Sequence, residues 1–203
     1  MKLTVSVLRL AALIALGWAS SALAADDGKA APDFAIADIL GKTHRLSDYR
    51  GKIVVLEWLN PACPYVTRHY RSGNLPSTQA AAAEAGAIWL QVNSTAMGDL
   101  DAAKTLEWQK KQGVIATAYL RDVDGKLGRL YQAQKTPHLY VIAPDGTLAY
   151  QGAIDDQPQA TQANTLSAHN YVKAAIAALK AGKPVEKPAT EAYGCAVKYG
   201  AEG

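Results

Sequence analysis

Residues 53–66 read IVVLEWLNPACPYV, an apolar run that closes on a cysteine and a proline. The continuous apolar character of residues 53–59 predicts a buried strand. Pro64 favours the first turn of a helix, because its missing N–H would have no partner there, and the helix should run to about Arg71. A cysteine at a helix N-terminus faces unpaired N–H groups and the positive end of the helix dipole, which stabilise a thiolate. The stretch therefore predicts a strand that leads into a helix, with a reactive thiol, Cys63, at their junction.

Strands and helices are predicted to alternate along the rest of the chain. The sequence indicates an N-terminal hairpin over 34–45, strands over 87–93 and 114–120, a hairpin over 139–150, and helices over 76–85, 99–112, 126–133 and 172–179. This order indicates a three-layer α/β domain with a mixed sheet. The tail, 183–203, is irregular but holds Cys195, Tyr193 and Tyr199, so we expect it to dock on the domain.

The first residues have the pattern of a secretory signal. Lys2 and Arg9 flank the start of an apolar segment, and the small residues after it end in Ala22-Leu23-Ala24. This pattern predicts a signal peptide, 1–24, cut after Ala24, and a single mature domain, 25–203, in the periplasm or outside the cell. A membrane anchor, the alternative, needs about 20 apolar residues, and this segment is shorter.

The charge of the mature chain is nearly balanced. Removing Lys2 and Arg9 from the 21 basic residues leaves 19 against 18 acidic ones, a net charge of +1 with histidines neutral. This balance argues against a nucleic-acid or membrane-surface partner.

Two cysteines, Cys63 and Cys195, lie 132 positions apart in a chain predicted to enter an oxidising compartment. One interpretation is a structural disulfide that ties the tail down. The other is an attacking thiol and a resolving thiol. The cysteine count alone leaves both open.

Several motifs resemble a known family. These are Ala31-Pro32-Asp33-Phe34, Ser47-Asp48-Tyr49-Arg50-Gly51-Lys52, the run from Glu57 to Val66 with Cys63 in it, Thr136-Pro137, and Tyr193-Gly194-Cys195-Ala196-Val197-Lys198-Tyr199. Together they resemble the redoxin branch of the thioredoxin superfamily. They are most similar to peroxiredoxin-like proteins of the alkyl hydroperoxide reductase and thiol-specific antioxidant (AhpC/TSA) class. The resemblance covers about residues 31–199 and implies a thioredoxin-like fold, a three-layer α/β/α domain with a mixed central sheet and an N-terminal β-hairpin extension.

The chain departs from the family patterns at two places. Thioredoxins use C-x-x-C, whereas Cys63 is followed by Pro64, Tyr65 and Val66, so no second thiol is nearby. True peroxiredoxins carry Pro and Thr or Ser where this chain has Leu56 and Asn60. A second thiol must therefore come from Cys195, whose tail would have to fold back to the roughly 4.4–6.8 Å Cα separation that a disulfide requires.

The resemblance implies roles for individual residues. Cys63 is expected to attack a peroxide or a disulfide, Cys195 to resolve the intermediate, and an external thiol to regenerate the pair, without a resident cofactor. Glu57 aligns with a buried acid that passes protons to the thiol chemistry, although it could also face outward or form a salt bridge. Thr136 and Pro137 resemble the cis-proline loop that faces the active cysteine. Expected substrate contacts are Asn60, Pro64, Tyr65, Arg68, Asn93, Thr136 and Pro137.

Two other classes of function stay open. Cys63, His69, His138 and Cys195 could bind a soft metal such as copper, although six residues along a helix rotate by about 600°, so Cys63 and His69 would not share a face. His138 could also simply begin a strand. The remaining alternative is a redox-inert binding protein in which the two cysteines form a structural disulfide.

Overall fold

The computed structural model describes residues 25, 27–96, 100–159 and 165–201. The predicted signal peptide, 1–24, lies outside this part of the chain. Of the helices within it, none has the length and apolar character needed to span a bilayer.

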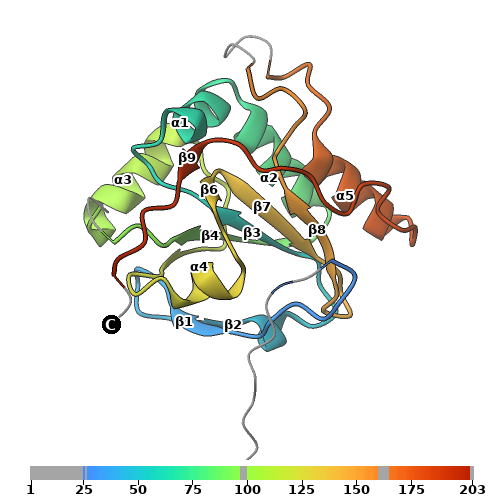
Figure 1. Ribbon diagram of the computed structural model, residues 1–203, viewed down its shortest axis with the longest axis horizontal. Helices are drawn as coiled ribbons and strands as arrows, with labels where there is room; N and C mark the ends of the chain where they lie inside the picture. The colour runs from blue at the N-terminus through green and yellow to red at the C-terminus, as the bar shows by residue number, and fades with distance from the viewer. Residues whose placement is uncertain (1–24, 26, 97–99, 160–164, 202–203) are drawn as a thin grey trace, which may run out of the picture.

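A five-stranded mixed sheet forms the centre of the domain (Figure 1). Its order is β5 (Ala118–Arg121), β4 (Ile88–Asn93), β3 (Val54–Trp58), β7 (His138–Ile142) and β8 (Leu148–Gly152). β3 is parallel to β4 and antiparallel to β7. All five residues of β3 are buried, which explains why the sequence of this strand is a continuous apolar run.

Helices and a hairpin cover the two faces of the sheet, as the α/β prediction requires (Figure 1). The helices α1 (Pro64–Arg71), α2 (Asn74–Glu84) and α5 (Tyr171–Lys180) contribute to the hydrophobic core on one face. The opposite face packs against α4 (Lys126–Leu130), the hairpin of β1 (Ala35–Ala37) and β2 (Thr43–Arg45), and the 3-10 helix η1 (Leu46–Tyr49). Helix α3 (Ala102–Gln112) contacts the first core through Trp108.

Three element boundaries differ from the predictions by three residues or more. The segment predicted as a strand from 114 does not pair until Ala118, because Val114 N–H bonds to the Gln109 carbonyl and completes the C-cap of α3 at Gly113. Helix α4 ends at Leu130, before Gln132 takes a left-handed φ of 55°. Helix α3 begins three residues later than predicted, with Asp101 as its N-cap, and the predicted start at Asp99 lies outside the described residues.

The tail docks on the domain as a C-terminal belt, which we define as residues 183–201. The belt runs from the end of α5 along the edge of the sheet at β8 (Figure 1). Its short strand β9 (Cys195–Ala196) pairs antiparallel with β6 (Lys135–Thr136). Further bonds join Gln151 of β8 to the belt backbone at residues 188 and 190, at 2.9 and 3.0 Å. The belt is therefore part of the folded domain.

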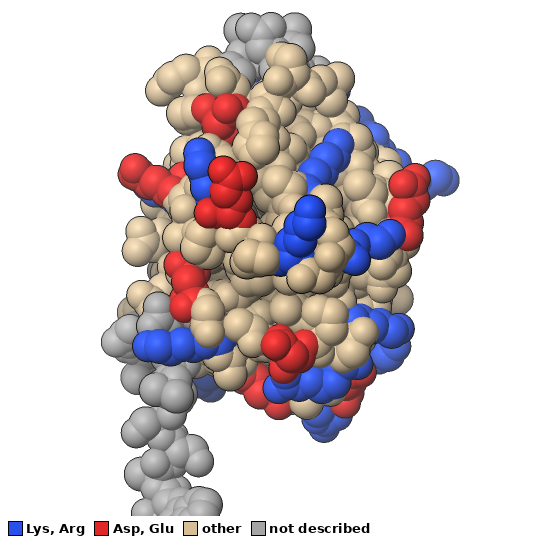
Figure 2. All heavy atoms as spheres, turned by 90° about the vertical axis from the view of Figure 1, so that its right-hand side faces the viewer, with Lys and Arg blue, Asp and Glu red and all other residues tan. Residues whose placement is uncertain are grey.

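Charged side chains of both signs are interspersed on the face that Figure 2 shows. No large patch of one sign appears on that face. This distribution agrees with the nearly balanced charge of the sequence.

Candidate active site

Cys63 occupies the N-cap of α1, immediately after β3 and the turn at residues 60–62. Its backbone is extended, with φ −75° and ψ 124°, and its carbonyl accepts the first helical bond from Thr67 N–H at 3.0 Å. Pro64 holds the first helical position, as the sequence predicts. The Cys63 residue is only 3% exposed. The nucleophile candidate is thus fixed by its own stretch of chain.

Cys195 lies directly opposite Cys63 across the end of the sheet. The two cysteines are free thiols whose Sγ atoms are 2.8 Å apart. The pairing of β9 with β6 sets Cys195 opposite Thr136, and the Cys63 thiol donates to the Thr136 carbonyl oxygen at 3.1 Å. The fold therefore brings together the two cysteines that the sequence separates by 132 positions.

The two thiols differ in acidity. Burial raises the pKa of Cys63, but hydrogen bonding to Cys195 and to the backbone N–H of Val66 outweighs this effect and lowers that pKa below its ordinary value. Burial and the adjacent Cys63 sulfur raise the pKa of Cys195 to about 11. Cys63 is accordingly the more acidic thiol of the pair and Cys195 the less acidic one.

The loop that faces Cys63 has the geometry that the resemblance implies. The Thr136-Pro137 peptide bond is cis. Gly194 approaches this loop with φ 133°, and a Cβ on Gly194 would lie 2.1 Å from the Thr136 carbonyl oxygen. Only glycine fits this approach, so Gly194 permits Cys195 to reach its position.

Glu57 is fully buried beneath the first helices and forms no bond to either thiol. Its carboxylate accepts bonds from Tyr70 OH and Trp89 Nε1, both at 2.8 Å, and from the side-chain amides of Gln79 and Gln91. Burial raises the pKa of Glu57 to about 7, although these donors oppose the shift. The structure thus excludes the outward-facing alternative, and Glu57 can exchange a proton near neutral pH.

A second buried polar cluster holds the belt to α1, and sequence reasoning missed it. We call Asn74, His69, Asp155 and Tyr193 the belt clasp. Tyr193 OH donates to Asp155 and lies 3.1 Å from His69 Nε2, while Asn74 Nδ2 donates to Asp155 Oδ2 at 2.8 Å. Burial lowers the pKa of His69 to about 4, so its ring is neutral. The feature of the sequence that could have indicated this cluster was the position of Tyr193, two residues before Cys195.

The predicted substrate contacts divide into two groups. Pro64, Tyr65, Thr136 and Pro137 are next to the thiols in the chain or in space, and the Arg68 guanidinium lies over the rings of Tyr65 and Tyr193 at 5.1 and 5.6 Å.

The second group consists of two asparagines that shape the turn before Cys63. Asn60 donates to Thr95 Oγ1 at 3.1 Å and accepts from Ala62 N–H at 2.8 Å. Asn93 is buried and bonds to Tyr119 OH and to Thr95 N–H, both at 3.0 Å. Thr95 therefore links Asn93 to Asn60.

The alternative metal ligands are not gathered at one point. In the described parts of the chain, no three His, Cys, Asp or Glu side chains form a group suited to a metal ion. His69 belongs to the belt clasp, and His138 begins β7 with its ring 4.5 Å from that of Tyr140.

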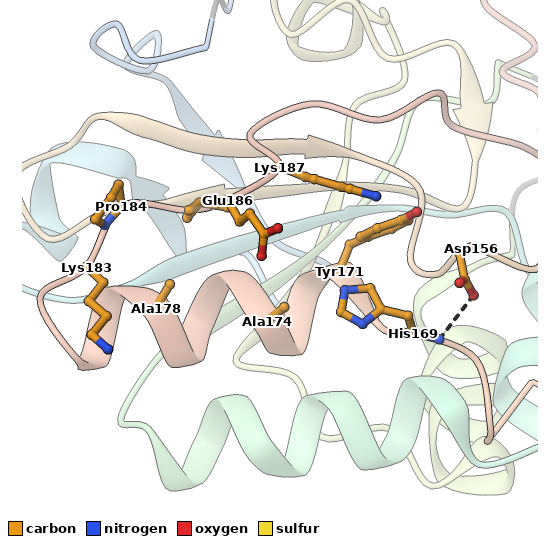
Figure 3. A pocket seen from close by; sticks show the side chains of 10 residues that line it. Asp156, His169, Tyr171, Ala174, Ala178, Lys183, Pro184, Glu186 and Lys187 are labelled. Carbon is orange, nitrogen blue, oxygen red and sulfur yellow. Dashed lines mark hydrogen bonds between the residues drawn. The ribbon is translucent and has the colours of Figure 1, made fainter.

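A cavity of about 460 Å³ lies away from the thiols, between α5 and the start of the belt (Figure 3). Tyr171, His169 and Lys187 line it, and Lys187 Nζ lies 5.5 Å from the Tyr171 ring centre. Figure 3 shows these side chains together with Glu186 and Asp156, so charges of both signs meet there. The cavity marks where the belt leaves α5 and takes no part in the thiol geometry.

Comparisons with solved structures show the same fold. A hypothetical protein from Sinorhizobium meliloti 1021 superposes with a TM-score of 0.73 at 21% identity, over 87% of this chain and 96% of that one. A Chlorobium tepidum protein assigned as a thiol:disulfide interchange protein DsbE gives a TM-score of 0.50 at 25% identity, over 63% of this chain and 85% of that one. The chain thus has the thioredoxin-like fold of thiol-disulfide oxidoreductases.

Sequence comparison with curated proteins matches a shorter region. The thiol-disulfide oxidoreductase ResA of Geobacillus thermodenitrificans (strain NG80-2) is 44% identical over 50 residues, which are 21% of this chain and 29% of that protein. The match therefore spans less than a third of the length of this relative. Residues 28–151, more than half of the chain, match the AhpC/TSA family. The chain therefore belongs to the AhpC/TSA family, within the redoxin branch of the thioredoxin superfamily.

Proposed function

We propose that this protein is an exported, peroxiredoxin-like thiol oxidoreductase in which Cys63 is the nucleophile and Cys195 the resolving thiol. The observation that carries the proposal is the 2.8 Å separation of the two free sulfur atoms at the N-terminus of α1. Export rests on the signal pattern of residues 1–24.

The first step uses the thiolate character of Cys63. With a hydroperoxide, the Cys63 thiolate attacks one oxygen, the O–O bond breaks, and the leaving alkoxide or hydroxide takes up a proton. Cys63 becomes a sulfenic acid. With a disulfide, the same thiolate attacks one sulfur, forms a mixed disulfide and releases the other sulfur as a thiolate. A lowered pKa at Cys63 supports both reactions.

The second step uses the proton of Cys195. Its sulfur attacks Cys63, an intramolecular disulfide forms, and the thiol proton leaves with the hydroxide as water or with the substrate sulfur as a thiol. Two equivalents of an external thiol then reduce the pair and are themselves oxidised to a disulfide. The pKa of about 11 at Cys195 keeps this proton in place until the intermediate exists.

Glu57 supports proton movement from below the site. With a pKa of about 7, this buried carboxyl changes protonation in the range where a thiol reaction consumes and releases protons. Its link to α1 is Tyr70, which is on the helix that Cys63 caps. We assign Glu57 as a proton reservoir rather than as a direct partner of the thiols.

The small hollow beside the first turn of α1 supports a compact substrate. Its volume is about 190 Å³, and Pro64, Tyr65 and Arg68 line it together with Pro158 and Gln159. Sites for drug-sized ligands usually enclose about 300–1,000 Å³. We therefore propose a hydroperoxide or a small disulfide as the substrate class.

The test is a redox titration of the full chain by thiol trapping and intact mass. We expect a bond between Cys63 and Cys195 with a midpoint between about −120 and −270 mV, the range of working redox couples. A midpoint below about −300 mV would instead identify a structural disulfide in a redox-inert protein. Two free thiols under all oxidising conditions would also overturn the proposal.

A further inference from the structure

We propose that the C-terminal belt determines substrate specificity: its strand β9 fills the edge of β6 where an extended peptide would pair, so that Cys63 reacts with small oxidants and excludes peptide disulfides. The inference rests on the proposed function and names its substrate class. Three independent observations support it.

The first observation is the occupied backbone edge. Lys135 and Thr136 of β6 pair with Ala196 and Cys195, and Val197 N–H bonds to the Gln134 carbonyl at 3.0 Å. An exposed strand edge is a general binding site for an extended peptide, because main-chain bonds supply the affinity. In this protein the edge beside Cys63 is taken by the chain's own cysteine-bearing strand.

The second observation is that Tyr193 of the belt covers Cys63 on the side of α1. The Tyr193 ring of the belt lies 6.1 Å from the Tyr65 ring, and the Arg68 guanidinium lies over both. The belt clasp fixes Tyr193 through Asp155 and His69. With β9 on one side and Tyr193 on the other, Cys63 is only 3% exposed. The docked belt thus covers the flank of Cys63 along which a peptide chain would lie.

The third observation is that glycines at three positions make room for the belt. A Cβ on Gly194 would lie 2.1 Å from the Thr136 carbonyl oxygen, and one on Gly152 would lie 2.3 Å from the Thr190 carbonyl oxygen. A Cβ on Gly128 would lie 2.5 Å from Tyr199 OH. Real Cβ atoms essentially never approach so closely, so the docked path depends on these glycines.

The experiment compares two activated disulfides that differ only in size. One is cysteamine and the other a short extended cysteine-containing peptide, each linked to the same coloured aryl thiol. The Cys63 thiolate attacks the aliphatic sulfur, a new disulfide forms, and the aryl thiolate leaves with the electron pair of the broken bond. A Cys195→Ser background confines the reaction to this step, and absorbance gives both rate constants.

Gly194→Ala on that background should loosen β9 from β6. We expect the peptide rate constant to rise about tenfold relative to the cysteamine rate constant, equivalent to about 1.4 kcal/mol in belt docking. Gly86→Ala is the matched control, because Gly86 also has a positive φ, 72°, but has nothing within 4 Å of an added Cβ. The control should leave the ratio of the two rate constants unchanged.

Val197→Pro is the second variant, in case Gly194→Ala does not fold. It removes the N–H that bonds to Gln134 and should shift the ratio in the same direction. Equal rate constants for both probes in the Cys195→Ser parent, or an unchanged ratio in both belt variants, would overturn the specificity proposal. Release of aryl thiolate from neither probe would overturn the proposed function itself.

Discussion

The start of α1 and the C-terminal belt each deliver one sulfur to the same point, and they do so by different means. At the start of α1, Cys63 is positioned by residues next to it in the chain, with the turn at Asn60 before it and Pro64 after it. In the belt, Cys195 is positioned by partners far away in the sequence, namely Thr136 through β6 and Asp155 through Tyr193. The local arrangement fixes the position of Cys63, whereas the long-range arrangement places Cys195 within reach and also helps to lower the pKa of Cys63.

Cys63→Ser should have the largest effect, because it removes the nucleophile from the local arrangement. We expect complete loss of thiol-dependent turnover of hydrogen peroxide and of small disulfides. Serine is close to cysteine in size, so thermal unfolding serves as the control and should change little. Residual turnover comparable with that of the unaltered chain would contradict the assignment of Cys63 and indicate that Cys195 is the nucleophile.

Cys195→Ser should stop catalysis after one round, because the long-range arrangement no longer supplies a second thiol. One equivalent of oxidant should react at Cys63 and leave a sulfenic acid, which a sulfenic-acid-specific reagent and intact mass would detect. Cys63 should still be oxidised in this first round. Undiminished steady-state turnover in this variant would contradict the assignment of Cys195 as the resolving thiol.

Glu57→Gln tests the region at the start of α1, where Glu57 bonds to Tyr70 of that helix. It should change how the free energy of unfolding depends on pH. The folded-state pKa of about 7 exceeds the ordinary 4.5, so the folded protein binds this proton more tightly than the unfolded chain does. The free energy of unfolding should therefore fall as pH rises from 4.5 to 7, by about 3 kcal/mol. Denaturant titrations across this range should show that Glu57→Gln flattens the fall.

Glu84→Gln provides the matched control, because Glu84 is exposed on α2. This variant should keep the slope of the unaltered chain. An equal flattening in both variants would show that Glu57 is not the titrating group. The expected sign is specific, because a carboxyl stabilised as the anion would produce a rise instead of a fall.

Tyr193→Phe should give the smallest effect, because it removes one hydroxyl from the belt clasp and leaves both thiols. The lost bonds to Asp155 and His69 are worth about 1–2 kcal/mol, so the rate of disulfide formation should drop about tenfold. Oxidation of Cys63 should keep its rate, which stopped-flow measurement of the two phases would resolve. Tyr49→Phe makes the same chemical change beside His44 and should leave both phases unaltered.

The same contrast explains how much of the structure could be predicted from the sequence. The strand before Cys63, the helix after it and the N-terminal hairpin are confirmed, because each depends on signals within a few residues. Strands β6 and β9 escaped prediction, because each has only two residues and no periodicity. Their pairing exists only through tertiary contacts.

The buried polar residues likewise could not be placed from local sequence signals alone. The sequence marked Glu57 as unusual in an apolar strand but left its direction open, since only the packing of Tyr70, Trp89 and Gln79 around it decides the matter. The belt clasp joins residues up to 124 positions apart, as the contact between His69 and Tyr193 shows. No local pattern reports such a cluster.

The separation of 132 positions between the two cysteines also has a consequence for biogenesis. A chain is made from its N-terminus, so Cys63 and the strands around it emerge long before the segment that carries Cys195. Until that segment arrives, the nucleophile has no intramolecular partner to complete its reaction. The redox pair therefore assembles only after the segment with Cys195 has been made, and a chain that stops before Cys195 could be oxidised but could not finish the cycle.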